Sequence, residues 1–187
     1  MTLTPEWRLL QKSRSGDKDA FGRLYDRHGP RVFQLLRRLT GSASSAEDLT
    51  QETFLTAWKT LGRWEGHGAF STWLCGIALN HSRTHRRSQK DADLLDETVE
   101  PAALDADPLL HLTRREAERV LEEAISSLPD TCREAFVLVR VEGLRYQEAA
   151  ALLGVPLGTV QSRIHRATAL LKAQLTDCPQ KGTPHVV

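Results

Sequence analysis

Apolar residues recur along this chain at intervals of three and four positions, and no stretch alternates convincingly as a strand would. In the N-terminal half this spacing predicts helices over residues 5–13, 21–39, 46–61 and 71–87. The second helix should be interrupted or kinked at Gly29-Pro30 and should end at Gly41. Ser44 or Ser45, followed three residues later by an acid, should cap the third. The pattern therefore predicts an all-α fold.

The C-terminal half continues the helical spacing in shorter pieces. It predicts a helix over residues 115–127, one capped by Asp130 and stopped at Gly143, a short one at 146–154 and a last one at about 158–175. A helix interior disfavours the Pro of Gly154-Val155-Pro156, so this stretch is a corner between two helices. Such a corner indicates a helix-turn-helix, although any helical hairpin can contain a similar turn.

Charge divides the 187-residue chain more clearly than its formal net charge of +1 suggests. The basic run RTHRRSQK at residues 83–90 is followed by DADLLDETVEPAALDADP, which contains no basic residue and two prolines. We interpret this acidic stretch as a flexible linker. The expected organisation is a helical module over 1–90, a linker over 91–112, a second helical module over 113–176 and a disordered tail over 177–187.

The composition is that of an ordinary globular chain, with 40% hydrophobic and 26% charged residues. The apolar runs are shorter than the roughly 20 residues of a membrane span, and MTLTPEWRLL does not resemble a signal peptide, so we expect a cytoplasmic protein. Cys75, Cys132 and Cys178 are too scattered for a disulfide framework or a zinc knuckle, and buried or idle thiols are expected. We expect neither a cofactor nor a bound metal.

The predicted helix at 46–61 has two distinct faces. Phe54, Ala57, Trp58 and Leu61 cluster on one side as a core stripe. The other side, which we call the acidic face, consists of Asp48, Gln51, Glu52 and Leu55. A leucine between two carboxylates and an amide indicates a surface that another protein covers. The alternative is a solvated face with one exposed leucine.

The predicted helix at 71–87 has an apolar side and a basic side. Trp73, Leu74, Ile77 and Thr84, with Phe70 before them, are expected in the core. The far side can meet phosphates and carries Thr72, Asn80, Arg83, Arg86 and Arg87. The preceding Gly-rich connector, with Arg63, Trp64, His67 and Phe70, could stack unpaired bases, although Trp64 taken alone is more typical of a core residue.

The last predicted helix combines a buried stripe with a face suited to DNA. Val160, Ile164, Ala167 and Leu171 form the stripe, and Ser162, His165 and Arg166 lie opposite, with Thr159 and Gln161 on the flanks. Arg166 can pair with guanine and Gln161 with adenine. Arg163 occupies a shoulder position better placed for a phosphate.

Two other classes of function are compatible with parts of this pattern. An enzyme would have to use His81 and His85, an i, i+4 pair that could hold a metal, but no third ligand is spaced to complete a site, and the pair is more typical of solvent-facing residues on a basic helix. A stand-alone helix-turn-helix regulator is the closer alternative, and the acidic face discriminates against it because such a regulator would not need that face.

Several segments together resemble a known family. AEDLTQETFLTAWKTL, FSTWLCGIALN with its trailing RTHRR, SLPDTCREAFVL and YQEAAALLGVPLGTVQSRIHRA follow one another in an order and spacing similar to the extracytoplasmic-function (group IV) sigma factors of bacterial RNA polymerase, in the sigma-70 family. The likeness covers most of residues 17–175. It implies that the first module is similar to sigma region 2 and the second to sigma region 4, with no region 1 or 3.

The resemblance implies a partner for each face. Asp48, Gln51 and Glu52 match the motif that docks on the beta-prime clamp of core polymerase, and the second module would meet the beta flap. The segment from Arg63 to Phe70, with Asn80, Arg83, Arg86 and Arg87, matches the part that opens and reads the minus-ten element, with Trp64 and Phe70 as candidates to line a base site. The residues that match the reader of the minus-thirty-five element are Thr159, Gln161, Ser162, Arg163, His165 and Arg166. Several relatives have a basic residue at the position of Gln161, so the promoter read here can differ.

Recruitment without covalent chemistry follows from the resemblance. Two tethered modules that each bind modestly combine their affinities once polymerase holds them at promoter spacing. The linker would run through the polymerase toward its active site. The family also implies restraint by an anti-sigma factor, and the free chain should bind promoter DNA weakly, in keeping with its low net charge.

Overall fold

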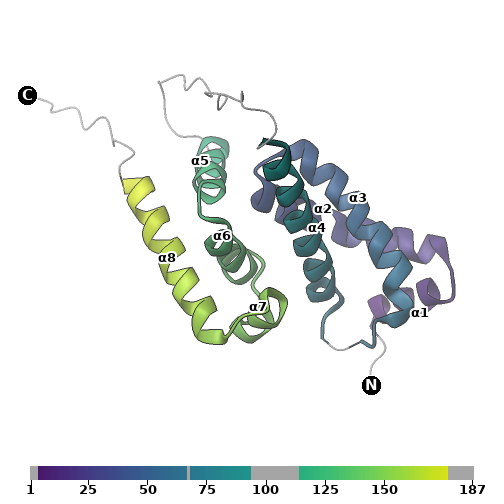
Figure 1. The fold of residues 1–187 in the computed structure, drawn as a ribbon. Coiled ribbons are helices and arrows are strands. Elements are labelled where there is room, and N and C mark those ends of the chain that lie inside the picture. The colour runs from purple at the N-terminus through teal and green to yellow at the C-terminus, as the bar shows by residue number, and fades with distance from the viewer. Residues whose placement is uncertain (1–3, 67, 94–113, 177–187) are drawn as a thin grey trace, which may run out of the picture. The chain divides into compact units, whose positions relative to one another are not determined.

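The computed structural model describes residues 4–66, 68–93 and 114–176. The chain divides into two compact units, the first containing α1 to α4 and the second α5 to α8 (Figure 1). Apart from one short 3-10 turn and one π-helical segment, the regular structure of these residues is α-helical, and no strand occurs among them. The predicted all-α fold in two helical modules is therefore confirmed.

The first unit consists of α1 (Pro5–Arg14), α2 (Lys18–Thr40), α3 (Ala43–Thr60) and α4 (Phe70–Asp93). Local chemistry sets the helix starts: the Thr4 hydroxyl accepts from the Trp7 N–H at 3.3 Å, and the Asp17 carboxylate accepts from the Ala20 N–H at 2.9 Å. Helices α2, α3 and α4 pack on one another, and α1 covers α2. Their shared core contains Leu24, Leu35, Leu36, Leu39, Leu74 and Leu79.

Two expectations about this unit are wrong. Helix α2 is not interrupted at Pro30, which lies inside it with an exposed side chain. The N–H that proline lacks would have bonded the carbonyl of exposed Asp26, which water can satisfy instead, while buried Val32 keeps the next turn in the core. The cap of α3 is Ser42, two residues before the nearer predicted cap Ser44, because the Ser42 hydroxyl accepts from the Ser45 N–H at 3.2 Å.

The second unit contains α5 (Arg114–Ser126), α6 (Asp130–Phe136), α7 (Tyr146–Leu153) and α8 (Leu157–Thr176). Helix α8 packs against α5, α6 and α7. A π-helical turn, Val137–Val141, follows α6 where the sequence predicts continued α-helix. Gly143, with φ of 72°, ends this segment as expected. Asp130 is not the cap of α6, because the helix begins at Asp130 itself and the capping position is Pro129.

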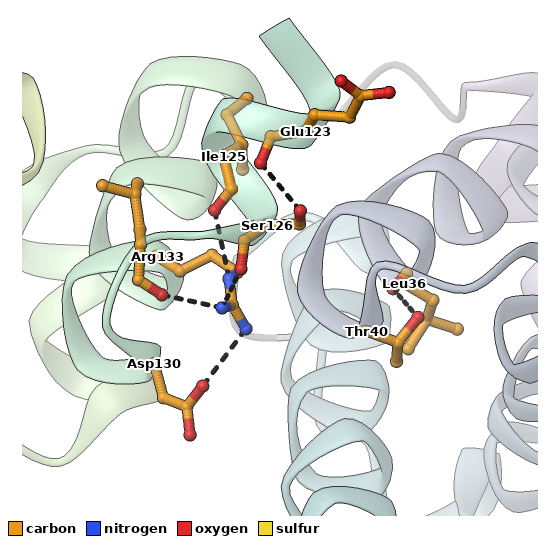
Figure 2. A network of polar contacts seen from close by, with 8 residues as sticks. Leu36, Thr40, Glu123, Ile125, Ser126, Asp130 and Arg133 are labelled. Carbon is orange, nitrogen blue, oxygen red and sulfur yellow. Dashed lines mark hydrogen bonds and ion pairs between the residues drawn. The ribbon is translucent and has the colours of Figure 1, made fainter. Parts of the chain in front are cut away.

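In the second unit, the Arg133 side chain of α6 reaches back to the end of α5 (Figure 2). Its guanidinium donates to the carbonyls of Ile125 at 3.1 Å, Leu128 at 2.7 Å and Ser126, and lies 3.1 Å from an oxygen of Asp130. These carbonyls lie at the C-terminal end of α5, where helical partners run out. The arginine side chain, only 11% exposed, therefore closes the end of α5 and fixes the corner between the two helices.

Helix α4 extends beyond the first predicted module. It runs to Asp93, so residues 91–93, which the sequence assigned to the linker, are helical. The remainder of the predicted linker and the predicted tail fall on residues 94–113 and 177–187, which lie outside the described residues. No helix in the described ranges is long and apolar enough to span a bilayer.

Candidate protein and nucleic-acid interfaces

The acidic face lies on the solvent side of α3, as its helical spacing predicts. Asp48, Gln51, Glu52 and Leu55 are all exposed, and Leu55 is 59% exposed, the largest exposed fraction among the large apolar side chains of the described residues. On the opposite side of the helix, Phe54, Ala57 and Leu61 are buried. Trp58, expected in the core, is only half-buried.

An apolar hollow next to the acidic face explains why Trp58 is partly exposed. The hollow has a volume of about 510 Å³, and two acidic-face residues, Gln51 and Leu55, form part of its wall. The rest of the lining consists of Lys18, Phe21, Gly22, Tyr25, Phe54 and Trp58. A second hollow of about 530 Å³ continues along the α2–α3 seam past Tyr25 and Gln51 to Phe33. The acidic face therefore borders a groove rather than a flat surface.

Aromatic rings packed edge to face form much of the wall of this groove. The Phe21 ring lies 4.9 Å from the Trp58 ring between centroids, and the Tyr25 ring lies 4.7 Å from the Phe54 ring, both edge to face. Sequence reasoning placed Phe21 and Tyr25 in the apolar series of α2 and missed their role in the groove. The available signal was a second row of residues on the same helix, because Phe21, Tyr25 and Gly29 follow one another at intervals of four beside the core position Leu24. In the structure, Tyr25 of this row is 41% exposed.

The connector between α3 and α4 is built around a buried aromatic cluster. Trp64 is 8% exposed and Phe70 is 2% exposed. The Trp64 ring lies 5.8 Å from Trp73 and 5.5 Å from Phe70, and the Arg14 guanidinium lies 5.7 Å from its centroid. An open stacking platform of Trp64 and Phe70 is therefore not present, because both rings pack into the first unit and support the loop from beneath.

The basic side of α4 is only partly as predicted. Asn80 and Arg87 are exposed, Arg63 before the loop is exposed, and Thr72, Arg83 and Arg86 are half-buried. The buried stripe differs from the prediction, because α4 packs against both α2 and α3 and so buries a wider sector. Leu74 and Phe70 are buried as expected, but Trp73 and Ile77 are half-buried and Thr84 is exposed. The buried residues of α4 are Phe70, Leu74, Cys75, Ala78, Leu79 and Ser82.

His81 and His85 are not the solvent-facing pair that the sequence suggested, since both are half-buried. The two ring nitrogens of His81 contact Glu52 and Thr56 of α3. His81 is thus engaged between two helices. Cys75 and Cys132 are buried, as predicted, and neither forms a disulfide, while Cys178 lies outside the described residues.

The turn between α7 and α8 is the predicted helix-turn-helix corner. Gly154 ends α7 in the left-handed region, with φ of 68° and its N–H bonded to the Ala150 carbonyl. The Pro156 carbonyl accepts from the Thr159 N–H at 3.0 Å and from the Val160 N–H at 3.3 Å, which starts α8 directly after the proline. The corner therefore uses glycine for the positive φ and proline outside the helix, where its missing N–H costs nothing.

Helix α8 presents the predicted faces. Val160, Ile164, Ala167 and Leu171 are all buried. The opposite side exposes Gln161, Ser162, His165 and Arg166, while Thr159 and Arg163 are half-buried at its margins. The Ser162 hydroxyl donates to the Thr159 carbonyl at 3.0 Å, so it has a partner already in the free chain. The side chains nearest to solvent are those that base-edge and phosphate contacts require.

Fold and surfaces together define a class of protein. A four-helix module with an acidic, groove-bordering face is joined along one chain to a helix-turn-helix module with a polar and basic face on its second helix. That combination is typical of a DNA-binding protein that also docks on a protein partner.

Comparisons with known proteins identify the family. Residues 24–92 match the family model "Sigma-70 region 2", and residues 118–171 match "Sigma-70, region 4". RNA polymerase sigma-H factor of Pseudomonas aeruginosa is 34% identical over 89% of this chain and 92% of its own length. ECF RNA polymerase sigma factor SigW of Bacillus subtilis is 31% identical over 90% of this chain and 95% of its own. The chain belongs to the extracytoplasmic-function sigma factors of the sigma-70 family.

A solved structure supports the same fold. CnrH, in complex with the cytosolic domain of CnrY, has a TM-score of 0.67 and 30% sequence identity, over 91% of this chain and 97% of that chain. The family models and the relatives therefore confirm the predicted family resemblance. Sigma factors are transcription initiation factors.

Proposed function

We propose that this chain directs core RNA polymerase to a specific set of promoters through three separate surfaces. The acidic face and the adjoining groove on α2 and α3 dock on the beta-prime clamp of polymerase. The edge of α4 with the preceding loop opens and reads the minus-ten element. The exposed side of α8 reads the minus-thirty-five element, and the second unit also meets the beta flap.

The observation that carries this proposal is the acidic face beside an apolar groove. A stand-alone DNA-binding regulator has no use for a leucine that is 59% exposed next to a hollow lined by aromatic rings. A partner with basic residues for Asp48 and Glu52 and an apolar side chain for the groove would satisfy both features. This favours polymerase-dependent action over the regulator alternative.

The minus-ten contacts are proposed on the residues that reach solvent. Arg63, Asn80 and Arg87 are exposed, and Arg83 and Arg86 border them on the same helix. Trp64 and Phe70 support the loop in the free chain and can line a base site only if the loop moves. Extruding a base costs a few kcal/mol, which binding to polymerase has to offset.

The minus-thirty-five contacts are proposed on α8. Arg166 and Gln161 have the side chains for bidentate pairing with guanine and adenine, and His165 and Ser162 lie on the same exposed side. Arg163 and Thr159, at the margins, are better placed for the phosphate backbone.

The proposal also covers the two modules and the control of the protein. Helices α1 to α4 correspond to region 2 and α5 to α8 to region 4, with a linker over the residues between them. The task is recruitment and needs no covalent chemistry, and it places the protein with polymerase in the cytoplasm. CnrH was solved in complex with the cytosolic domain of CnrY, which supports binding of this chain by a second protein, and the family implies that this protein is an anti-sigma factor.

Run-off transcription with core polymerase tests the proposal. The chain, added to core polymerase and a library of promoter fragments from its own genome, should produce transcripts that are absent without it. Asp48→Arg should abolish them, whereas Asp19→Arg, which reverses an exposed carboxylate on α2, should not. Arg166→Ala should alter promoter preference, and Lys172→Ala, an exposed basic position further along α8, should leave it unchanged. Duplex binding without any new transcript would refute the polymerase role and favour the regulator.

A further inference from the structure

One side chain connects the acidic face to the DNA-facing helix. His81 of α4 lies between Asn80 and Ser82 in the chain and points its ring at α3. Its Nδ1 atom is 3.3 Å from a carboxylate oxygen of Glu52, and its Nε2 atom is 2.9 Å from the hydroxyl of Thr56. Glu52 and Thr56 are one turn apart on α3, so a single ring contacts two successive positions of the neighbouring helix.

The hydroxyl of Thr56 is oriented differently from those of its neighbours on α3. Thr50, Thr53 and Thr60 each donate to the carbonyl four residues before them, at 2.6, 2.7 and 2.7 Å. The Thr56 hydroxyl reaches across to His81. Because threonine hydroxyls in helices ordinarily bond back to their own turn, this orientation indicates that the pairing with His81 is favourable.

The contact is compatible with either protonation state of the ring. An ionised Glu52 carboxylate can only accept, so a proton on Nδ1 of a neutral His81 makes this contact favourable, and Nε2 then accepts from the Thr56 hydroxyl. In the protonated ring both nitrogens donate, and the Thr56 oxygen accepts instead. The Thr56 hydroxyl can therefore pair with the ring in either state.

We propose that His81 is a positioning residue for polymerase docking, an inference that rests on the docking role proposed above for the acidic face. Glu52 is 57% exposed, and a free glutamate at that exposure samples several rotamers. The His81 ring, 26% exposed and anchored by Thr56, holds the carboxylate in one orientation before the partner arrives. Pre-ordering of this kind strengthens binding because less side-chain freedom is lost on association.

The location of His81 gives the contact a second consequence. The same turn of α4 carries Asn80 and Arg83, which are proposed to read promoter DNA. A partner that binds Glu52 therefore binds a carboxylate that is in contact with His81 of α4, the helix proposed to face DNA. The polymerase-facing and DNA-facing helices share this polar link in addition to their apolar packing.

Titration of the full chain into core polymerase, with the equilibrium Kd as the readout, tests the proposal. His81→Ala should raise Kd about three- to fivefold, the scale of one partly exposed charge-assisted contact. His81→Gln should stay within about twofold, because its amide offers a donor and an acceptor. Thr56→Val, which frees one side of the ring, should have a smaller effect than His81→Ala, and Thr60→Val, which removes only a bond within α3, should have none.

A double-mutant cycle separates positioning from a general structural effect. In a Glu52→Ala background, His81→Ala should cause no further loss, because the carboxylate it positions is gone. The same fold-loss in both backgrounds, or no loss from His81→Ala alone, would overturn the inference. Asp48→Arg is measured alongside: if it leaves Kd unchanged, the docking role of the acidic face fails, whereas a large loss there with no effect at His81 refutes the positioning role alone.

Discussion

Arg133→Ala should strongly destabilise the second unit while leaving the stability of the first unchanged. The guanidinium supplies bonds to three carbonyls at the end of α5 and a contact with Asp130. Losing the donor to a part-buried acceptor costs about 1 kcal/mol for each carbonyl, and the partly exposed Asp130 contact adds less than about 1 kcal/mol. The expected loss is about 3–4 kcal/mol. A unit of this size has only about 3–9 kcal/mol of stability, so the change removes much of it.

The distribution of tryptophan makes the assay selective. All four tryptophans, at positions 7, 58, 64 and 73, belong to the first unit, so their fluorescence in a urea titration reports that unit alone. Far-UV circular dichroism reports the helices of both units. Arg133→Ala should shift part of the dichroism transition to lower urea and leave the fluorescence transition in place.

Arg133→Lys provides a graded control. An ammonium can satisfy one or two of the carbonyls but cannot reproduce the planar fork, so the loss should be roughly half as large. Wild-type behaviour in both signals for Arg133→Ala would refute the idea that this side chain closes α5. A shift in the fluorescence transition would show that the two units do not unfold independently.

Three smaller changes test other parts of the chain. Leu55→Ser should weaken polymerase binding about tenfold in the titration into core polymerase, judged from one apolar side chain worth about 1.5 kcal/mol. Gly154→Ala should destabilise the helix-turn-helix by about 1 kcal/mol because φ is 68°, seen as an earlier dichroism transition. Ser42→Ala should cost about 1 kcal/mol through loss of the α3 cap, seen this time in tryptophan fluorescence.

Several features of the fold could be predicted because their causes are local. The buried stripe of α8 follows from the spacing of Val160, Ile164, Ala167 and Leu171, and the corner before it follows from a glycine at positive φ and a proline outside the helix. The exposure of the acidic face follows in the same way from the spacing of α3. In each case the buried side chains form one stripe along the helix, so the spacing of apolar residues in the sequence predicts which of them are buried.

Other features depended on which helices meet. The buried sector of α4 could not be placed from its own spacing, because α2 and α3 both cover it and leave Thr84 outside. Trp64 taken alone is more typical of a core residue, while the Gly-rich connector around it also allowed a stacking platform, and its packing against Trp73 and Phe70 decides for the core. The cap at Ser42 depended on the backbone at the end of α2 rather than on the nearest serine to the apolar run.

The sequence by itself determined the helices, the two modules and the family, since helical period, turn chemistry and ordered motifs are all written in short stretches of the chain. Only the tertiary structure decided the groove beside the acidic face and the contact of His81 with Glu52 and Thr56. Both join α3 to residues of another helix, Tyr25 on α2 and His81 on α4. Spacing along one helix sets which side of it faces inward, but the partner on that side depends on how the helices pack.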